Sequence, residues 1–111
     1  MEKLLNSVSG VILDYREMND VLVFNDTETL SGMLKNLSSD LFFLEKYRDE
    51  YARKYNAILY TEIKEGSSVS GADIIAKERV PELYQLRRLM TSAYKVQDAI
   101  RTNISFLKME R

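Results

Sequence analysis

The chain has 111 residues, of which 45% are hydrophobic and 30% are charged, and its formal net charge is −1. It contains neither cysteine nor histidine, which excludes Cys/His zinc sites, cysteine nucleophiles, Ser-His-Asp triads and disulfide bonds. No apolar run approaches the roughly 18 residues that cross a bilayer, and the N-terminal residues lack the pattern of a secretory signal. We therefore expect one cytoplasmic domain over residues 1–111, with no metal, no other cofactor and no membrane contact.

The first predicted element is an amphipathic helix over residues 2–23. Gly10 and neighbouring β-branched residues lower its intrinsic helix propensity, so we expect it to depend on packing against its own chain or a second subunit. Its apolar residues follow helical spacing and are Leu5, Val8, Ile12, Tyr15 and Leu22.

The second predicted helix covers residues 28–65. Asn25, Asp26 or Thr27 can cap its start, and Gly66 follows its last turn as a stop signal. Its apolar stripe is wide enough to indicate contacts with two neighbouring helices. The residues of this stripe are Leu30, Leu34, Leu37, Leu41, Phe42, Phe43, Leu44, Tyr51, Tyr55 and Ile58.

The third predicted helix covers residues 72–110 and is kinked near Pro81, because an internal proline removes one backbone hydrogen bond. It consists of a short segment over residues 72–79 and, after the kink, a straight helix from Pro81 to about Lys108. Ser70 and Asp73 have the spacing of a capping box at its start. The polar loop at residues 66–71 joins the second and third helices into an elongated antiparallel hairpin. The sequence therefore predicts an all-α fold that assembles into an oligomeric helical bundle.

Charge is distributed unevenly along the chain. Residues 1–76 contain 8 Lys/Arg and 13 Asp/Glu, whereas residues 77–111 contain 8 and 4. Cations bind phosphates and exposed tyrosine rings stack on bases, so the mixture of both on the third helix is typical of single-strand nucleic-acid binding. The candidate nucleic-acid-binding residues are Lys77, Tyr84, Arg87, Arg88, Tyr94, Lys95, Arg101 and Lys108.

The same features also have structural interpretations. The basic residues can form a solvated face or pair with the acidic second helix, and tyrosines at helical spacing more often pack in a core or interface. Carboxylates occur without the Glu-x-x-His pairs of di-iron bundles, and the loop at residues 66–71 lacks the Gly-Lys-Ser/Thr of a P-loop. We therefore predict no catalytic residue. The acidic candidates for binding a protein partner are Asp40, Asp49 and Glu50.

Two stretches of the third predicted helix carry a family resemblance: Pro81-Glu-Leu-Tyr-Gln-Leu-Arg-Arg-Leu-Met-Thr-Ser-Ala-Tyr, and Ala99-Ile-Arg-Thr-Asn-Ile-Ser-Phe-Leu-Lys-Met-Glu-Arg111. They resemble small helical proteins of bacteriophage early regions, most of all the UvsY-type recombination mediators of T-even phages. The similarity spans residues 40–111. It implies an all-helical oligomer that binds single-stranded DNA and helps a recombinase to load past the single-strand binding protein. The DNA contacts that the resemblance implies are Arg87, Arg88, Lys95, Arg101 and Lys108.

Two functions follow as expectations. The first is a non-enzymatic phage accessory protein of DNA recombination or replication, which forms a homo-oligomer in the host cytoplasm and binds single-stranded DNA and a recombinase or other DNA-processing protein. The alternative is a protein-binding module that inhibits a host enzyme or defence complex without binding nucleic acid. A purely structural oligomer is a third interpretation.

Overall fold

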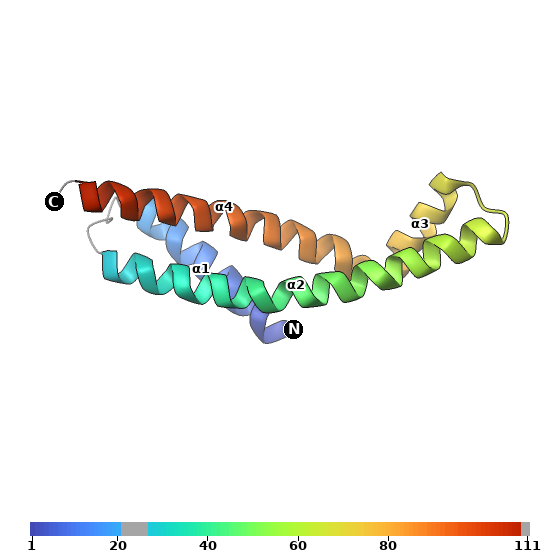
Figure 1. Ribbon diagram of the computed structural model, residues 1–111, viewed down its shortest axis with the longest axis horizontal. Helices are drawn as coiled ribbons and strands as arrows, with labels where there is room; N and C mark the ends of the chain where they lie inside the picture. Colours follow the sequence, from blue (N-terminus) through green and yellow to red (C-terminus); the bar gives the residue numbers. More distant parts are fainter. Residues whose placement is uncertain (21–26, 110–111) are drawn as a thin grey trace. The chain divides into compact units, whose positions relative to one another are not determined.

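The computed structural model describes residues 1–20 and 27–109. These residues form four helices and no strand: α1 (Glu2–Asp20), α2 (Thr27–Lys64), α3 (Val69–Arg79) and α4 (Pro81–Met109) (Figure 1). The all-α class predicted from the sequence is confirmed. The predicted end of the first helix at residue 23, with Leu22, and the predicted caps Asn25 and Asp26 lie outside the described residues.

The chain divides into two compact units. Unit 1 comprises Met1–Leu44 and Leu89–Arg111, and unit 2 comprises Glu45–Arg88. Helices α2 and α4 therefore contribute one segment to each unit, whereas α1 belongs to unit 1 and α3 to unit 2. The single domain, the hairpin and the oligomeric bundle remain predictions.

Unit 1 contains α1 and one segment each of α2 and α4, which lie side by side (Figure 1). Every segment turns one apolar side toward the other two, as the three- and four-residue spacing predicts. Burying one leucine-sized side chain contributes about 1.5–3 kcal/mol, so this core is the main favourable term within the unit. Its buried residues are Val8, Ile12, Tyr15, Leu30, Leu37, Leu41, Leu44, Met90, Ala93, Val96 and Ile100.

Side-chain hydrogen bonds fix how the segments of unit 1 align. Ser7 of α1 donates to Asp40 of α2, with 2.6 Å between the oxygens. Gln97 of α4 is buried and donates from Nε2 to the Ser38 hydroxyl of α2 at 2.7 Å. A buried amide without a partner costs about 1–3 kcal/mol, so a helix register that separates Gln97 from Ser38 is disfavoured.

Tyr15 joins α1 to α4 within the same unit. Its side chain is only 8% exposed, and Asn103 donates a hydrogen bond from Nδ2 to the Tyr15 hydroxyl. Burial raises the pKa of the Tyr15 phenol above its usual value of 10.0, and the hydrogen bond from Asn103 acts in the opposite direction. The buried phenol is therefore held in its neutral form.

In unit 2, α3 presents a narrow apolar side. Its buried residues are two alanines, Ala72 and Ala76, which bury little apolar area. The residue after α3 and the first turns of α4 add larger buried side chains, namely Val80, Leu83 and Leu86. Because its own apolar contribution is small, α3 needs polar contacts to stay on α2.

Those polar contacts come from both ends of α3. The Tyr55 hydroxyl of α2 donates to the Asp73 carboxylate, and Arg79 forms an ion pair with Glu62 of α2 at 3.6 Å. Both involve side chains that are half-buried on α2, where an ion pair is screened less than on an open surface. The two contacts therefore hold α3 against the second half of α2.

The end of α2 matches the predicted stop signal. Gly66 has a φ of 105°, its N–H donates to the Ile63 carbonyl at 3.1 Å, and the Ser67 N–H donates to the Glu62 carbonyl at 2.9 Å. This pair of bonds is a Schellman motif, which satisfies carbonyls that the helix leaves unpaired. The predicted role of Gly66 is therefore confirmed, with Lys64 as the last helical residue.

The predicted break near Pro81 is confirmed, because a short helix ends before the proline and a long helix begins at it, although α3 begins at Val69 and not at residue 72. Val80 leaves the helical conformation (φ −128°, ψ 63°), and its N–H closes α3 on the Ala76 carbonyl at 2.9 Å. Pro81 then opens α4 at the first helical position, where a missing N–H costs nothing. The short segment predicted over residues 72–79 and the straight helix predicted from Pro81 to about Lys108 therefore correspond to α3 and α4.

The predicted capping box at Ser70 and Asp73 is wrong. Helix α3 begins at Val69, and its N-cap is Ser68, whose hydroxyl accepts from the Gly71 N–H at 3.0 Å. The Asp73 carboxylate binds the Tyr55 hydroxyl instead of a backbone N–H. A contact with α2 therefore prevails over the local cap.

The exposed aromatic pair Phe42 and Phe43 also differs from expectation. Both were expected to contact a second helix, but Phe42 is 71% exposed, and the two rings meet edge-on with their centroids 5.6 Å apart. The apolar stripe of α2 is thus narrower than the sequence suggested. The stripe continues on its predicted side through Leu37, Leu41 and Leu44.

Alanine at Gly66 and alanine at Gly32 should change the free energy of unfolding in opposite directions. Gly66→Ala forces a side chain into a left-handed conformation and should lower the free energy of unfolding by about 1–2 kcal/mol. Gly32→Ala lies in the helix, where nothing within 4 Å opposes the new Cβ, and should raise it by up to about 1 kcal/mol. Urea unfolding followed by far-ultraviolet circular dichroism measures both, and equal midpoints for the two variants would contradict the assignment.

Tyr15 should make the protein sensitive to alkaline pH. Because its folded pKa is raised, its contribution to stability is complete below about pH 10 and is lost as the pH rises further toward the folded pKa. Tyr15→Phe has no such proton to lose, so the free energy of unfolding should fall more steeply between about pH 9 and pH 11 in the parent than in the variant. Parallel urea series at these pH values test this, and identical slopes would refute it.

Candidate nucleic-acid interface

The predicted nucleic-acid-binding residues lie on α3 and α4, but in two different units. Those of unit 2 are Lys77, Tyr84, Arg87 and Arg88. Those of unit 1 are Tyr94, Lys95, Arg101 and Lys108. All except Tyr94 are exposed, so each group offers charge to solvent. Each unit therefore carries one group of four candidates.

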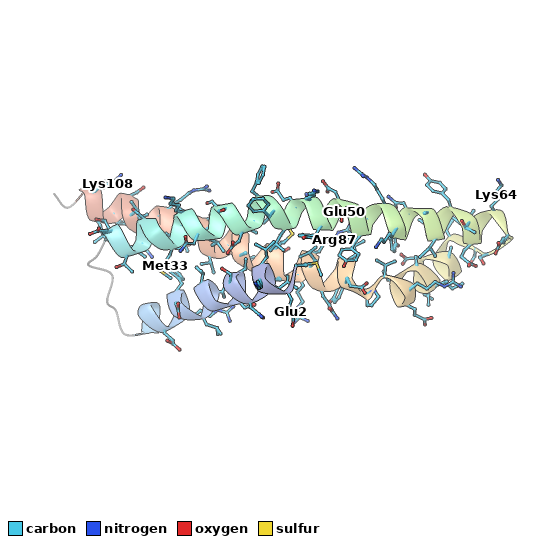
Figure 2. The ribbon with its side chains drawn as sticks, turned by 90° about the horizontal axis from the view of Figure 1, so that it is seen from below. Glu2, Met33, Glu50, Lys64, Arg87 and Lys108 are labelled. Atoms are coloured by element: carbon cyan, nitrogen blue, oxygen red, sulfur yellow. The ribbon has the colours of Figure 1, made fainter. Side chains whose placement is uncertain are left out.

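Tyr84 and two arginines share one exposed stretch of α4 in unit 2. The Tyr84 side chain is 66% exposed, and Arg87 and Arg88 follow three and four residues later, on the same side of the helix. Arg88 has no carboxylate within 4.0 Å in the described part of the chain, whereas Arg87, labelled on α4 in Figure 2, takes part in a further contact. An accessible ring therefore lies one helical turn from an accessible guanidinium.

Lys77 has a structural role in the same unit. Its ammonium forms an ion pair with Asp73 at 2.9 Å, one helical turn away on α3. Because Asp73 also accepts the hydroxyl of Tyr55, the lysine lies beside the contact that holds α3 on α2. The expected pairing with the acidic second helix does not occur at Lys77, because its carboxylate partner lies on α3 itself.

The group in unit 1 is less uniform. Arg101 pairs with Asp98 at 3.5 Å, and both side chains are exposed, so the pair contributes only about 0–1 kcal/mol. Lys95 and Lys108 are exposed and have no carboxylate within 4.0 Å in the described residues. Tyr94 is half-buried and engaged in another contact, so it does not offer an open ring.

The three acidic candidates are divided between the two units. Asp40, in unit 1, is half-buried and accepts the Ser7 hydroxyl, which ties α1 to α2. Asp49 and Glu50 belong to unit 2, and Asp49 lies 3.5 Å from Arg48. Of the three, Glu50 is both exposed and more than 4.0 Å from every cation of the described residues. It is labelled on α2 in Figure 2.

Sequence reasoning missed a cationic side of α2 in unit 2. Arg53, Tyr60 and Lys64 are all exposed, and their separations of seven and four residues place them on the same side of the helix. Figure 2 shows Lys64 on the side of α2 that faces away from α3. The spacing was present in the sequence, but the acidic total of residues 1–76 concealed it.

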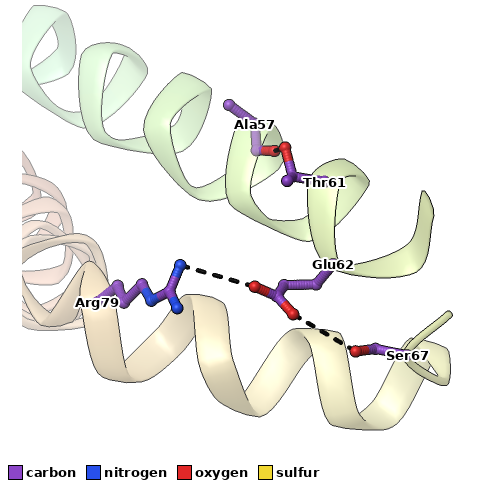
Figure 3. Close-up of polar contacts among 5 residues, drawn as sticks. All are labelled: Ala57, Thr61, Glu62, Ser67 and Arg79. Carbon is purple, nitrogen blue, oxygen red and sulfur yellow. Dashed lines mark hydrogen bonds and ion pairs between the residues drawn. The ribbon is translucent and has the colours of Figure 1, made fainter. Parts of the chain in front are cut away.

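Glu62, the acidic residue between Arg53 and Lys64, lies on the opposite side of α2, because it is nine residues after Arg53. Its side chain is only 14% exposed and points toward α3, where Oε1 lies 3.6 Å from Nη1 of Arg79 and Oε2 accepts the Ser67 hydroxyl at 3.4 Å (Figure 3). Beside it on α2, the Thr61 hydroxyl donates to the Ala57 carbonyl at 2.9 Å, within the same helix. The carboxylate is thereby removed from the outward side.

Two other kinds of site find no support in the described residues. Among residues 1–20 and 27–109, no group of three or more acidic side chains is arranged to hold a metal ion. Over the same residues, none of the helices has the length and apolarity required to span a bilayer. What these residues do offer is exposed cations next to exposed tyrosine rings.

Comparison with known proteins finds no family model, no curated protein and no solved structure that matches this chain. The resemblance to UvsY-type mediators therefore remains a prediction. The arguments for a function come from the exposed side chains of each unit.

Chemical nitration should separate the exposed tyrosines from the buried one. Tyr60 is 73% exposed and Tyr84 is 66% exposed, whereas Tyr15 is buried, so tetranitromethane should modify the first two well before the third. Peptide mass spectrometry over a time course measures the order. Modification of Tyr15 at the rate of Tyr60 in the folded protein would contradict the burial described above.

Proposed function

We propose that this protein is a non-enzymatic accessory factor of DNA recombination or replication that binds single-stranded DNA. The observation that carries the proposal is the exposed Tyr84 ring one helical turn before Arg88 in unit 2. A base stacked on an aromatic ring contributes about 1–3 kcal/mol, and a neighbouring cation binds the adjoining phosphate. The likeness of the α4 sequence to UvsY-type mediators of T-even phages supports the same role.

The remaining predicted cations are assigned supporting roles. Lys95, Arg101 and Lys108 supply phosphate contacts from unit 1, because all three are exposed and an exposed ion pair such as that of Arg101 is readily exchanged for a phosphate. Tyr94 and Lys77 are secondary, since the ring of the first is half-buried and the ammonium of the second is paired.

The proposed assembly is a homo-oligomer in the host cytoplasm that also binds a recombinase or another DNA-processing protein. Each copy presents few phosphate contacts, and linking several copies on one strand raises the overall affinity without any new contact. Glu50 is the acidic candidate that best suits a basic surface on the partner, because it is exposed and the described residues give it no cation within 4.0 Å.

A second candidate function is a protein-binding module that inhibits a host enzyme or defence complex. The exposed Phe42–Phe43 pair in unit 1 favours it, since aromatic side chains are enriched in protein interfaces. In this case Phe42 and Phe43 would insert into an apolar recess of the target, and the cations of α4 would be solvated.

The test is a salt titration of binding to a labelled dT oligonucleotide of about 20 nucleotides. Arg88→Gln should weaken binding several-fold at about 50 mM salt and reduce the slope of log affinity against log salt by about 0.7, the value of one phosphate contact on a single strand. Tyr84→Ala should weaken binding with little change in this slope, because stacking releases no counterions.

Arg16→Gln is the matched control, since it changes net charge equally at an exposed position of α1. It should leave the affinity and the slope within error. The proposal fails if the parent protein does not bind at about 50 mM salt, or if Arg16→Gln and Arg88→Gln weaken binding equally. Absence of binding together with capture of a host protein through Phe42 would favour the second candidate.

A further inference from the structure

We infer that the outward side of α2 in unit 2 is a second stacking site for single-stranded nucleic acid. We call it the α2 face, and its residues are Arg53, Lys54, Asn56, Ala57, Tyr60 and Lys64. The inference rests on the proposed function and extends it to a surface that is distinct from the Tyr84 and Arg88 stretch of α4.

The charge of the α2 face favours a polyanion. Between residues 53 and 64 the exposed side chains include three cations, and the described residues place no carboxylate within 4.0 Å of any of them. The one acidic residue in this stretch is Glu62, and its carboxylate is turned to Arg79 and Ser67 (Figure 3). A phosphate backbone that approaches α2 between residues 53 and 64 therefore meets cations, and the exposed carboxylates of Asp49, Glu50 and Glu65 lie before and after this stretch.

The geometry around Tyr60 favours stacking. The ring is 73% exposed, and the residue one turn before it is Ala57, whose side chain is too short to cover the ring. Asn56 and Lys64 lie four residues to either side, so an amide and an ammonium flank the position of a stacked base. Arg53 and Lys64 are separated by about 16 Å along the helix, a span over which a strand can contact both.

Lys54 is already ordered on this part of α2. Its Nζ lies 5.2 Å from the centroid of the Tyr51 ring, within the range of a cation–π contact. An ordered cation loses less side-chain entropy when it binds a phosphate than a freely rotating one does. Lys54 therefore extends the cationic side without the usual ordering cost.

A membrane surface is less suited to the α2 face than a nucleic acid is. A helix that lies on a bilayer buries a broad apolar side, and here the exposed residues between 53 and 64 are mainly charged or polar. Tyr60 and Ile63 are the large apolar side chains that this stretch exposes. Single-stranded nucleic acid, which needs a flat ring among cations, is the occupant that the face fits.

The first experiment places a carboxylate on the face. Ala57→Glu puts a negative charge one turn from both Arg53 and Tyr60, and should weaken binding of the full chain to a dT oligonucleotide about tenfold at about 50 mM salt. Ala57→Gln has the same shape and helix propensity without the charge, and should bind within about twofold of the parent. Equal helix content by circular dichroism confirms that both variants are folded.

The second experiment separates stacking from charge. Tyr60→Ala should weaken binding to the dT oligonucleotide by about fivefold to 150-fold, and Tyr60→Phe, which keeps the ring, should weaken it little. On an abasic oligonucleotide of equal length, which has phosphates but no bases, the three proteins should bind alike.

The outcomes distinguish this inference from the proposed function. If Arg88→Gln weakens binding and the Ala57 and Tyr60 variants do not, the α4 stretch binds DNA and the α2 face does not. If Tyr60→Ala has equal effects on dT and on the abasic strand, stacking is refuted. If the parent binds anionic phosphatidylglycerol vesicles through Tyr60 and does not bind dT, both the inference and the proposed function are overturned.

Discussion

The contact of Glu62 with Arg79 and Ser67 joins α2 to α3 in unit 2 and holds the carboxylate on the side of α2 that faces α3. It depends on two local stop signals in the chain. Gly66 ends α2 in a left-handed turn, which brings Ser67 back toward Glu62, and Pro81 ends α3 directly after Arg79. The same contact holds α3 on α2, because the two buried alanines of α3 bury little apolar area. One ion pair thus fixes the position of α3 and keeps the Glu62 carboxylate away from the outward side of α2.

In unit 1, polar side chains determine how the helices align, and apolar side chains fill the core between them. Leucines at helical spacing can pack in several registers, but Gln97 is buried and must find a partner. The hydrogen bonds from Gln97 to Ser38 and from Asn103 to Tyr15 form together in one alignment of the segments. These bonds select a register, whereas the apolar side chains supply the stabilisation.

Periodicity in the sequence predicted much of this fold. The prediction failed at the start of α3, where the cap signal fits two serines. The bounds of α2 were correct to one residue at each end, because a regular stripe and Gly66 define them. Pro81 marked the break between α3 and α4, because a proline removes a backbone hydrogen bond of the helix before it. Ser68 and Ser70 both match a cap, and the bond from Tyr55 to Asp73 favours the earlier one.

Helical spacing predicted one part of the candidate site, on α4, and the part on α2 was missed. Exposure of Tyr84 and Arg88 follows from their position opposite the apolar stripe of α4, so spacing alone predicted it. The α2 face was missed because a charge total over residues 1–76 hides the local grouping of its cations, although helical spacing places Glu62 on the opposite side of α2.

The most direct measurement of the central claim is photo-cross-linking of the folded protein to an oligonucleotide that carries 5-iodouracil, with the linked peptides identified by mass spectrometry. Bases that stack on tyrosine should give adducts in the tryptic peptides of residues 55–64 and 80–87, which contain Tyr60 and Tyr84. Adducts confined to α1, or none at a concentration of protein that saturates the strand, would contradict the account.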